Sequence, residues 1–200
     1  MRVVLATANP GKQREFATLL APRGFELVLQ SDLGIASVEE TGNTFEDNAL
    51  LKARHAAAAS GLPALADDSG LEVDALGGRP GVWSARFAGP DATDEQNNAR
   101  LIADLEGIPE EKRTARYRCV LALVRSPGDT QPILAQGSWE GRIGLEPVGS
   151  GGFGYDPYFI PTGLNCTAAE LSRARKNALS HRGAALRDLI ARLGQLGLSA

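Results

Sequence analysis

The chain has 200 residues, of which 43% are hydrophobic and 22% charged, and its formal net charge is −3. This length and composition fit one globular domain over residues 1–200, with enough apolar residues for a sizeable core. The small negative charge excludes a general attraction to nucleic acid or to an anionic membrane, so any anion site must be local. No apolar run approaches the roughly 20 residues that a membrane-spanning helix needs.

The first half of the chain predicts strands alternating with helices. Apolar, β-branched runs predict buried strands, and Asn, Thr and Gly at the ends of helical patterns predict caps. The predicted elements are a strand at 2–6, a helix from Pro10 to Gly24 capped by Asn9, a strand at 25–30, a helix at 45–60 and a short strand at 64–66. A further strand and turn follow at 71–78, after the sequence DDSG.

The second half adds a hairpin and three helices. Thr93 and Gln96 form a capping box before a helix at 94–105, and Thr167 and Glu170 form another before a helix at 169–179. Strands are predicted at 115–125, 132–143 and 158–161, and a C-terminal helix is striped by apolar residues over 186–193. Because the central hairpin is antiparallel, we predict an α/β fold: a long mixed β-sheet with helices on both faces.

The stretch ATANPGK, residues 6–12, joins the first strand to the first helix. A helix N-terminus carries unpaired N–H groups and a partial positive charge, which suit a phosphate. Thr7, Asn9 and Lys12 add a hydroxyl, an amide and a positive charge, but the G-x-x-x-x-G-K-[ST] loop is absent. The alternative interpretation is an Asn-Pro helix cap beside a solvated lysine.

Two adjacent carboxylates, Asp67 and Asp68, follow the short strand at 64–66. Successive strand residues point to opposite faces, so we expect only one aspartate to face a cleft. Carboxylates suit Mg²⁺, and Glu39 or Glu40 could supply the second one. Two alternatives stay open: a solvated Asp-Ser-Gly turn, or an aspartic-protease D-[ST]-G signature, against which the long helices argue.

Two further motifs carry ligand-binding side chains. In GSGGFGYDP, residues 149–157, glycines allow close approach, aromatic rings can stack on a base and Asp156 can accept hydrogen bonds. In SHRG, residues 180–183, His181 and Arg182 offer donors to an acceptor oxygen. The alternatives are a flexible loop and a helix cap with a surface arginine.

Taken in order, these motifs resemble the non-standard purine nucleoside triphosphate pyrophosphatases, the inosine/xanthosine triphosphate pyrophosphatase family. The resemblance runs from residue 3 to about 193 and rests on T-A-N-P-G-K, EETGNTFEDNALLKA, ALADDSGLEVDALGGRPGVWSARFAG, GFGYDP and SHRG. It implies Mg²⁺-dependent hydrolysis of ITP, dITP and XTP to the monophosphate and pyrophosphate, which removes deaminated purines from the nucleotide pool. The fold implied has two lobes flanking a central substrate cleft, usually in a homodimer.

The resemblance also implies a role for each motif residue. Asp68 matches the catalytic proton acceptor, and Glu39 with Asp68 matches the Mg²⁺ ligands. The substrate-binding positions are Thr7, Ala8, Asn9, Pro10, Gly11, Lys12, Lys52, Ser69, Phe153, Gly154, Tyr155, Asp156, Lys176, His181 and Arg182. A rival hypothesis is a module that binds nucleotides without catalysis.

We expect this chain to reside in the reducing cytoplasm. Its two cysteines, Cys119 and Cys166, lie far apart without the spacing of metal ligands. The opening MRVVLATANP predicts a first strand and not a secretion signal.

Overall fold

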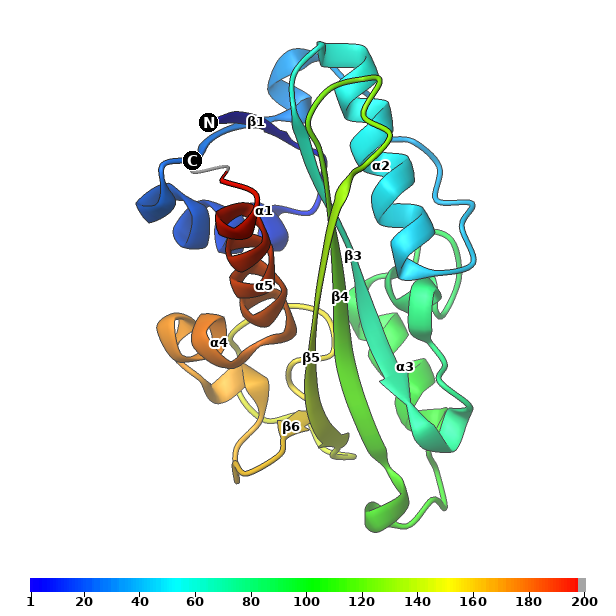
Figure 1. Cartoon of the computed structure of the whole chain (residues 1–200). Coiled ribbons are helices and arrows are strands. Elements are labelled where there is room, and N and C mark those ends of the chain that lie inside the picture. The colour runs from blue at the N-terminus through cyan, green and yellow to red at the C-terminus, as the bar shows by residue number, and fades with distance from the viewer. Residues whose placement is uncertain (198–200) are drawn as a thin grey trace. The chain divides into compact units, whose positions relative to one another are not determined.

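The computed structural model describes residues 1–197 and contains a mixed β-sheet, as predicted. Its six strands lie in the order β2-β1-β3-β4-β5-β6 (Figure 1). The strand β1 pairs in parallel with β2 and β3, whereas β5 and β6 are antiparallel. The strands are β1 (Arg2–Leu5), β2 (Glu26–Leu29), β3 (Ala64–Val73), β4 (Thr114–Val124), β5 (Ile133–Ile143) and β6 (Phe159–Pro161).

The helices begin and end largely where the sequence predicts. They are α1 (Pro10–Leu20), α2 (Phe45–Ser60), α3 (Asp94–Asp104), α4 (Arg173–Leu179) and α5 (His181–Gln195). The Thr44 side chain caps α2 by accepting from the N–H of Asp47, and Gly61 ends this helix at a φ of 70°. The capping box of Thr93 and Gln96 is present at the start of α3.

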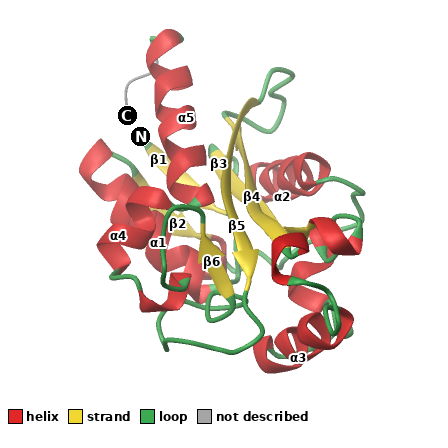
Figure 2. Ribbon diagram, turned by 90° about the horizontal axis from the view of Figure 1, so that it is seen from below, coloured by secondary structure: helices red, strands yellow, loops and turns green. Residues whose placement is uncertain are grey.

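The described residues form two compact units, and the first holds residues 1–68, 119–137 and 182–197. Its helices α1 and α5 lie on one face of its strands, and α2 lies on the other (Figures 1 and 2). Side chains of α1, α5 and the strands form one core; it includes Phe16, Leu65, Leu121 and Leu189. Buried alanines let α2 pack closely.

The second unit holds residues 69–118 and 138–181. Its core joins the helix α3 to the strands and to the loop that follows residue 150; among its members are Leu71, Leu101, Tyr117 and Phe159.

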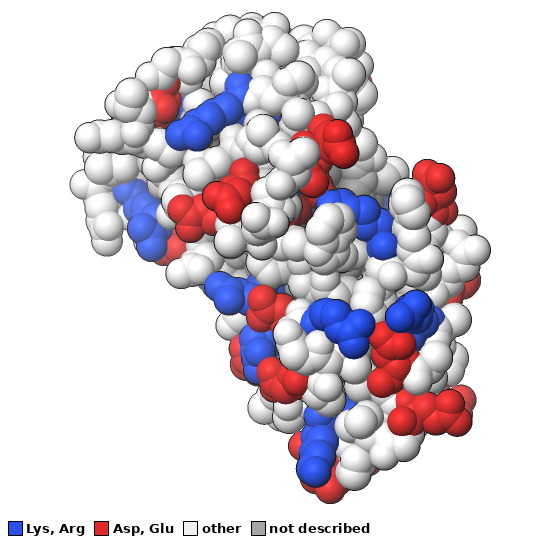
Figure 3. All heavy atoms as spheres, turned by 90° about the vertical axis from the view of Figure 1, so that its right-hand side faces the viewer, with Lys and Arg blue, Asp and Glu red and all other residues white. Residues whose placement is uncertain are grey.

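Figure 3 shows basic and acidic side chains interspersed on one side of the molecule, without a large area of one sign. Any anion site is therefore local on this face, as the low net charge predicts.

Four predicted boundaries are wrong. The helix predicted to run from Pro10 to Gly24 ends as an α-helix at Leu20, and a 3-10 helix, Ala21–Arg23, continues it to Gly24. The strand predicted at 64–66 continues through DDSG as β3 to residue 73, and Gly70 does not adopt a positive φ, so the Asp-Ser-Gly turn is absent. The box of Thr167 and Glu170 caps only a 3-10 helix, Ala168–Glu170, before α4 begins. The last helix begins at His181, earlier than its apolar stripe indicates.

Among residues 1–197, no helix combines the length and the apolar character that crossing a membrane requires.

Candidate active site

The loop before α1 has the helix-cap geometry of the alternative interpretation. The Asn9 side-chain oxygen accepts hydrogen bonds from the backbone N–H groups of Gly11 (2.8 Å) and Lys12 (3.1 Å). The Thr7 hydroxyl accepts from the N–H of Asn9 at 3.2 Å. Because Asn9 already satisfies two N-terminal donors, what the loop adds to a phosphate site is the positive helix end and the Lys12 side chain.

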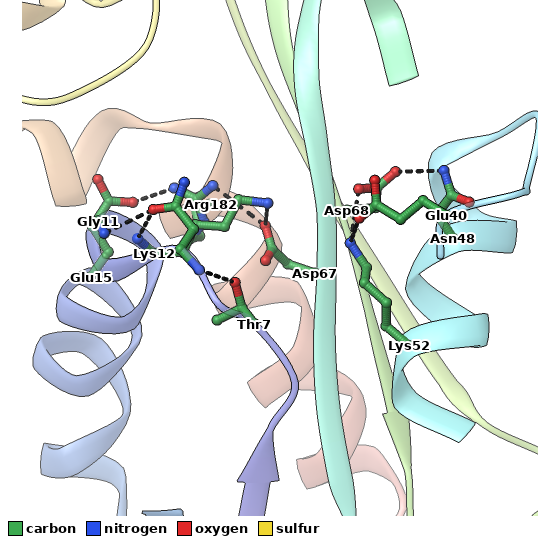
Figure 4. A network of polar contacts seen from close by, with 11 residues as sticks. Thr7, Gly11, Lys12, Glu15, Glu40, Asn48, Lys52, Asp67, Asp68 and Arg182 are labelled. Carbon is green, nitrogen blue, oxygen red and sulfur yellow. Dashed lines mark hydrogen bonds and ion pairs between the residues drawn. The ribbon is translucent and has the colours of Figure 1, made fainter. Parts of the chain in front are cut away.

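Lys12 belongs to a buried charge cluster on one face of β3 (Figure 4). Its Nζ lies 2.9 Å from Oδ2 of Asp67, and Nη2 of Arg182 lies 3.4 Å from the same oxygen. Arg182 also donates to Glu15 on α1. Asp67 is fully buried and Arg182 is 1% exposed. Burial alone would raise the pKa of Asp67, but the charges of Lys12 and Arg182 hold this pKa well below its usual range.

Asp68 belongs to a second cluster, on the opposite side of β3 (Figure 4). Nζ of Lys52 lies 3.0 Å from Asp68 Oδ1 and 2.6 Å from Glu40 Oε1. The amide of Asn48 donates to Asp68 Oδ2 at 3.2 Å. Burial raises the pKa of Asp68, and the Lys52 charge only partly offsets this effect.

The pleat of β3 therefore separates the two adjacent carboxylates, as the alternation of strand side chains predicts. The two clusters still act on each other electrostatically. The charge of Lys12 lowers the pKa of Asp68, and the charge of Asp67 raises the pKa of Lys52. Both clusters lie within the first unit.

The glutamate beside Asp68 is Glu40. Glu39, which the family resemblance matches to a metal ligand, is exposed in the sequence segment before α2. Glu40 is partly buried and shares Lys52 with Asp68. Of the two glutamates that the sequence suggested, Glu40 is therefore the one that lies beside Asp68.

The second unit holds a separate polar cluster around Asp156. Its Oδ2 accepts from Nζ of Lys176 at 2.6 Å and from the N–H of Phe153 at 2.9 Å. The same Nζ lies 4.7 Å from the centroid of the Phe153 ring. Gly152 has a φ of 77°, and a Cβ there would lie 2.0 Å from Asp156 Oδ2. Only glycine therefore allows this loop to fold over the carboxylate.

Three other residues predicted to bind the nucleoside also belong to the second unit. His181 is buried and stacks on Tyr117. Tyr155 is buried in the core, and its hydroxyl donates to the carbonyl of Ser84 at 2.7 Å. Ser69 follows Asp68 on β3 and is partly buried. Of the two aromatic residues expected to stack on a base, Phe153 is the more exposed.

Sequence reasoning missed several residues that hold these side chains. Asn48 lies one helical turn before Lys52 on α2, and this i, i+4 spacing was the signal that could have found it. Glu15 lies three residues after Lys12, an i, i+3 spacing that also places both side chains on one face of α1. On α3, Asp94 accepts from the N–H of Gly154 at 2.7 Å, and Asn98 donates to the Gly154 carbonyl at 3.0 Å. No local pattern links these two residues to a loop more than fifty positions away.

The donor set around Asp68 suits a magnesium ion that also binds a phosphate. No group of three or more His, Cys, Asp or Glu side chains among residues 1–197 could hold a metal by itself. Mg²⁺ commonly binds through one or two carboxylates and completes its shell with water and substrate phosphates. Asp68 and Glu40 both contact the ammonium group of Lys52, so they could supply the two carboxylates of such a site.

Comparison with known proteins gives consistent results over almost the whole chain. The family model described as Ham1 family matches residues 3–192. A protein from Photobacterium profundum named dITP/XTP pyrophosphatase is 56% identical over 192 residues, covering 96% of this chain and 98% of that protein.

Solved structures agree. A HAM1 protein from Coxiella burnetii has a TM-score of 0.89 at 45% identity, covering 98% of this chain and 99% of that one. A nucleoside-triphosphatase / dITP/XTP pyrophosphatase from Mycobacterium abscessus has a TM-score of 0.76 at 45% identity, covering 95% and 99%.

Proposed function

Because this chain belongs to the Ham1 family, we propose that it hydrolyses dITP, ITP and XTP to the nucleoside monophosphate and pyrophosphate. The names of its relatives support this activity. The single observation that carries it is the pair of coupled clusters on β3, where Lys12, Lys52 and Arg182 gather around Asp67 and Asp68. The protein thereby removes deaminated purines from the nucleotide pool.

The phosphates are bound by the first unit. A nucleoside triphosphate brings about four negative charges, which need local cations and a helix N-terminus to offset them. Lys12 and Lys52 supply those charges, and residues 7–12 supply the helix end. Asp67 and Glu15 hold Lys12 and Arg182 in place, so they act as positioning residues.

Asp68 accepts the proton of the attacking water. The water adds to the α-phosphorus, the bond from that phosphorus to the oxygen bridging the α- and β-phosphates breaks, and pyrophosphate leaves. A raised pKa makes Asp68 a stronger base than an ordinary aspartate. Asn48 and Lys52 fix the carboxylate, so its orientation is set before the substrate binds.

Asp68 would hold the magnesium ion together with Glu40, or with Glu39 as the resemblance implies. When bound, Mg²⁺ neutralises the negative charge that builds up on the pyrophosphate leaving group. Lys52, which bridges Asp68 and Glu40, adds its own charge next to the same carboxylates.

The purine base is read by donors and acceptors of the SHRG and GFGYDP motifs. Hypoxanthine and xanthine carry a 6-oxo acceptor where adenine carries an amino donor. If His181 donates to that oxygen, adenine would present a second donor to the same N–H group, and rejection of about a hundredfold is expected for such a mismatch. Phe153, Tyr155, Asp156 and Lys176 complete the proposed base site.

We also propose a cytoplasmic homodimer. The two free cysteines, Cys119 and Cys166, are consistent with a reducing compartment. We expect light scattering to give twice the mass of one chain at micromolar concentration. A monomer under those conditions would contradict the homodimer.

Pyrophosphate release from ITP, dITP, XTP and ATP, with and without Mg²⁺, tests the activity. We expect rapid Mg²⁺-dependent release from the first three nucleotides and little from ATP. Asp68→Asn should abolish release, while Asp32→Asn, which removes an exposed carboxylate of the same unit, should not. Binding of ITP without release would instead support a nucleotide-binding module, and peptide cleavage at acid pH an aspartic protease.

A further inference from the structure

Tyr117, near the start of β4, contacts two side chains of the proposed base site. Its ring lies parallel to the imidazole of His181, with the ring centroids 4.7 Å apart and an interplanar angle of 12°. Its hydroxyl is hydrogen-bonded to Asp156. All three residues belong to the second unit, and none of the sequence motifs includes Tyr117.

The Tyr117 ring is itself held by the core. It meets Phe159 edge to face, at 4.7 Å and 61°, and Phe159 packs against Trp139 at 5.4 Å. Tyr117 is only 8% exposed. Close packing in the core holds the Tyr117 ring in one orientation. The ring therefore offers the stacked imidazole a fixed surface.

His181 needs such a support because its donors lie in the plane of its ring. The imidazole begins α5, directly after the residue Ser180 that ends α4. Rotation of the ring about its last side-chain bond would turn its N–H away from a base oxygen. A flat neighbour at 12° restricts that rotation, so Tyr117 fixes the direction in which His181 donates.

We propose that Tyr117 is a positioning residue for base recognition, which acts by holding the His181 ring in the plane where it meets the purine 6-oxo group. This inference rests on the proposed function. The ring carries the effect, because Asp156 also accepts from Lys176 and Phe153 and does not depend on the tyrosine hydroxyl alone.

Three variants separate this role from ordinary packing. Tyr117→Leu removes the stacking surface, and Tyr117→Phe keeps it. Trp139→Leu is the matched control, because Trp139 is equally buried at 8% and also packs on Phe159 without stacking on His181. Urea unfolding first establishes that each variant is folded, and Tyr117→Met replaces the leucine variant if that one is not.

We expect Tyr117→Leu to raise the KM for ITP about tenfold and to lower the preference for ITP over ATP, with kcat little changed. Tyr117→Phe should behave like the wild type, and Trp139→Leu should lose stability while keeping its KM and preference. Equal KM shifts in Tyr117→Leu and Trp139→Leu, or a phenylalanine variant as impaired as the leucine one, would overturn the inference. A wild type that releases no pyrophosphate would overturn the proposed function instead.

Discussion

At the scale of single residues, Asp67 and Asp68 are adjacent in sequence but differ in chemistry. Asp67 is fully buried between two cations, and its pKa is held well below the usual range. Asp68 is bound by one lysine and one amide, and burial raises its pKa. One carboxylate therefore remains a fixed anion, while its neighbour is suited to take up a proton.

We predict that Asp67→Asn destabilises the fold, because it leaves the buried Arg182 and the partly buried Lys12 without their shared anion. Loss of one partner from a buried ion pair typically costs about 3–5 kcal/mol. Urea unfolding at neutral pH measures this loss, with Asp32→Asn as the control for removing an exposed carboxylate. A change as small as that of the control would mean that Asp67 contributes little to the fold.

The lowered pKa of the Asp67 carboxyl group should also make the stability of the fold depend on pH. Its pKa is lower in the folded chain than in the unfolded one, so its contribution is complete above the unfolded value of about 4. The contribution is lost as the pH falls from there toward the folded pKa. The unfolding free energy of the wild type should thus fall more steeply below about pH 4 than that of Asp67→Asn.

We predict that Lys52→Met shifts the acid limb of the kcat/KM profile to higher pH. Burial raises the pKa of Asp68, and the positive charge of Lys52 is the largest effect that lowers it. Removing Lys52 should therefore raise this pKa. Arg54→Met, which removes an exposed cation from the same helix, should leave the limb in place. An unmoved limb in Lys52→Met would exclude Asp68 as the group that titrates there.

At the scale of elements, α2 positions Asn48 and Lys52 through its entry loop. The N–H of Gly42 donates to the Asn48 side-chain oxygen at 2.8 Å, and a Cβ on Gly42 would lie 2.6 Å from that atom. The loop and the first turns of α2 are therefore fitted to each other without spare room. The position of the amide that binds Asp68 depends on that fit.

We predict that Gly42→Ala lowers stability by about 1–3 kcal/mol, as overpacking commonly does. It should also lower kcat, because displacing Asn48 loosens the Asp68 carboxylate. Gly128→Ala is the control, since a Cβ there meets nothing within 4 Å and its φ is not in the left-handed region. Calorimetry and the pyrophosphate assay measure both effects, and normal turnover would show that Asn48 does not orient Asp68.

The elements that the sequence predicts well are those with local signals. The cap Thr44 and the stop Gly61 define α2 at both ends, and the Thr93 box defines the start of α3. The continuation of β3 through Asp67 and Asp68 had no such signal, because cations from α1, α2 and α5 compensate these charges. Tertiary partners, not local propensity, keep this segment extended.

The site follows the same rule. Lys12, Asp68 and His181 stand in short motifs and could be found from them. Asn48 and Glu15 lie one helical turn from Lys52 and Lys12, so helical spacing could have pointed to them, whereas Tyr117 acts through contacts between distant segments that a single sequence does not reveal. Glu40, and not Glu39, contacts Lys52, and this difference is set by the geometry of the segment before α2, which the sequence does not show.

At the scale of the whole molecule, thermal stability measures substrate binding independently of substrate hydrolysis. A ligand that binds only the folded chain stabilises it by about 2.7 kcal/mol at a hundredfold excess over Kd. For a chain of this size, we expect the melting temperature to rise by roughly 2–4 °C for each kcal/mol.

We predict that ITP with Mg²⁺ raises the melting temperature of Asp68→Asn without releasing pyrophosphate. Lys12 and Lys52, the cations that we propose bind the phosphates, remain in this variant, so binding should persist although turnover is lost. Differential scanning calorimetry measures the shift, and ATP at the same concentration is the control for base recognition. No shift with ITP would mean that Asp68 is needed for binding as well as for chemistry.

The opposite orientation of Asp67 and Asp68 also limits how this protein can change during evolution. Side chains of a strand alternate with a period of two, so inserting or deleting one residue between Ala64 and Asp67 would exchange the two carboxylates between faces. A deletion would place Asp68 where Asp67 now meets Lys12 and Arg182, and an insertion would place Asp67 where Asp68 now meets Lys52. Length variants of this segment should therefore survive only in steps of two.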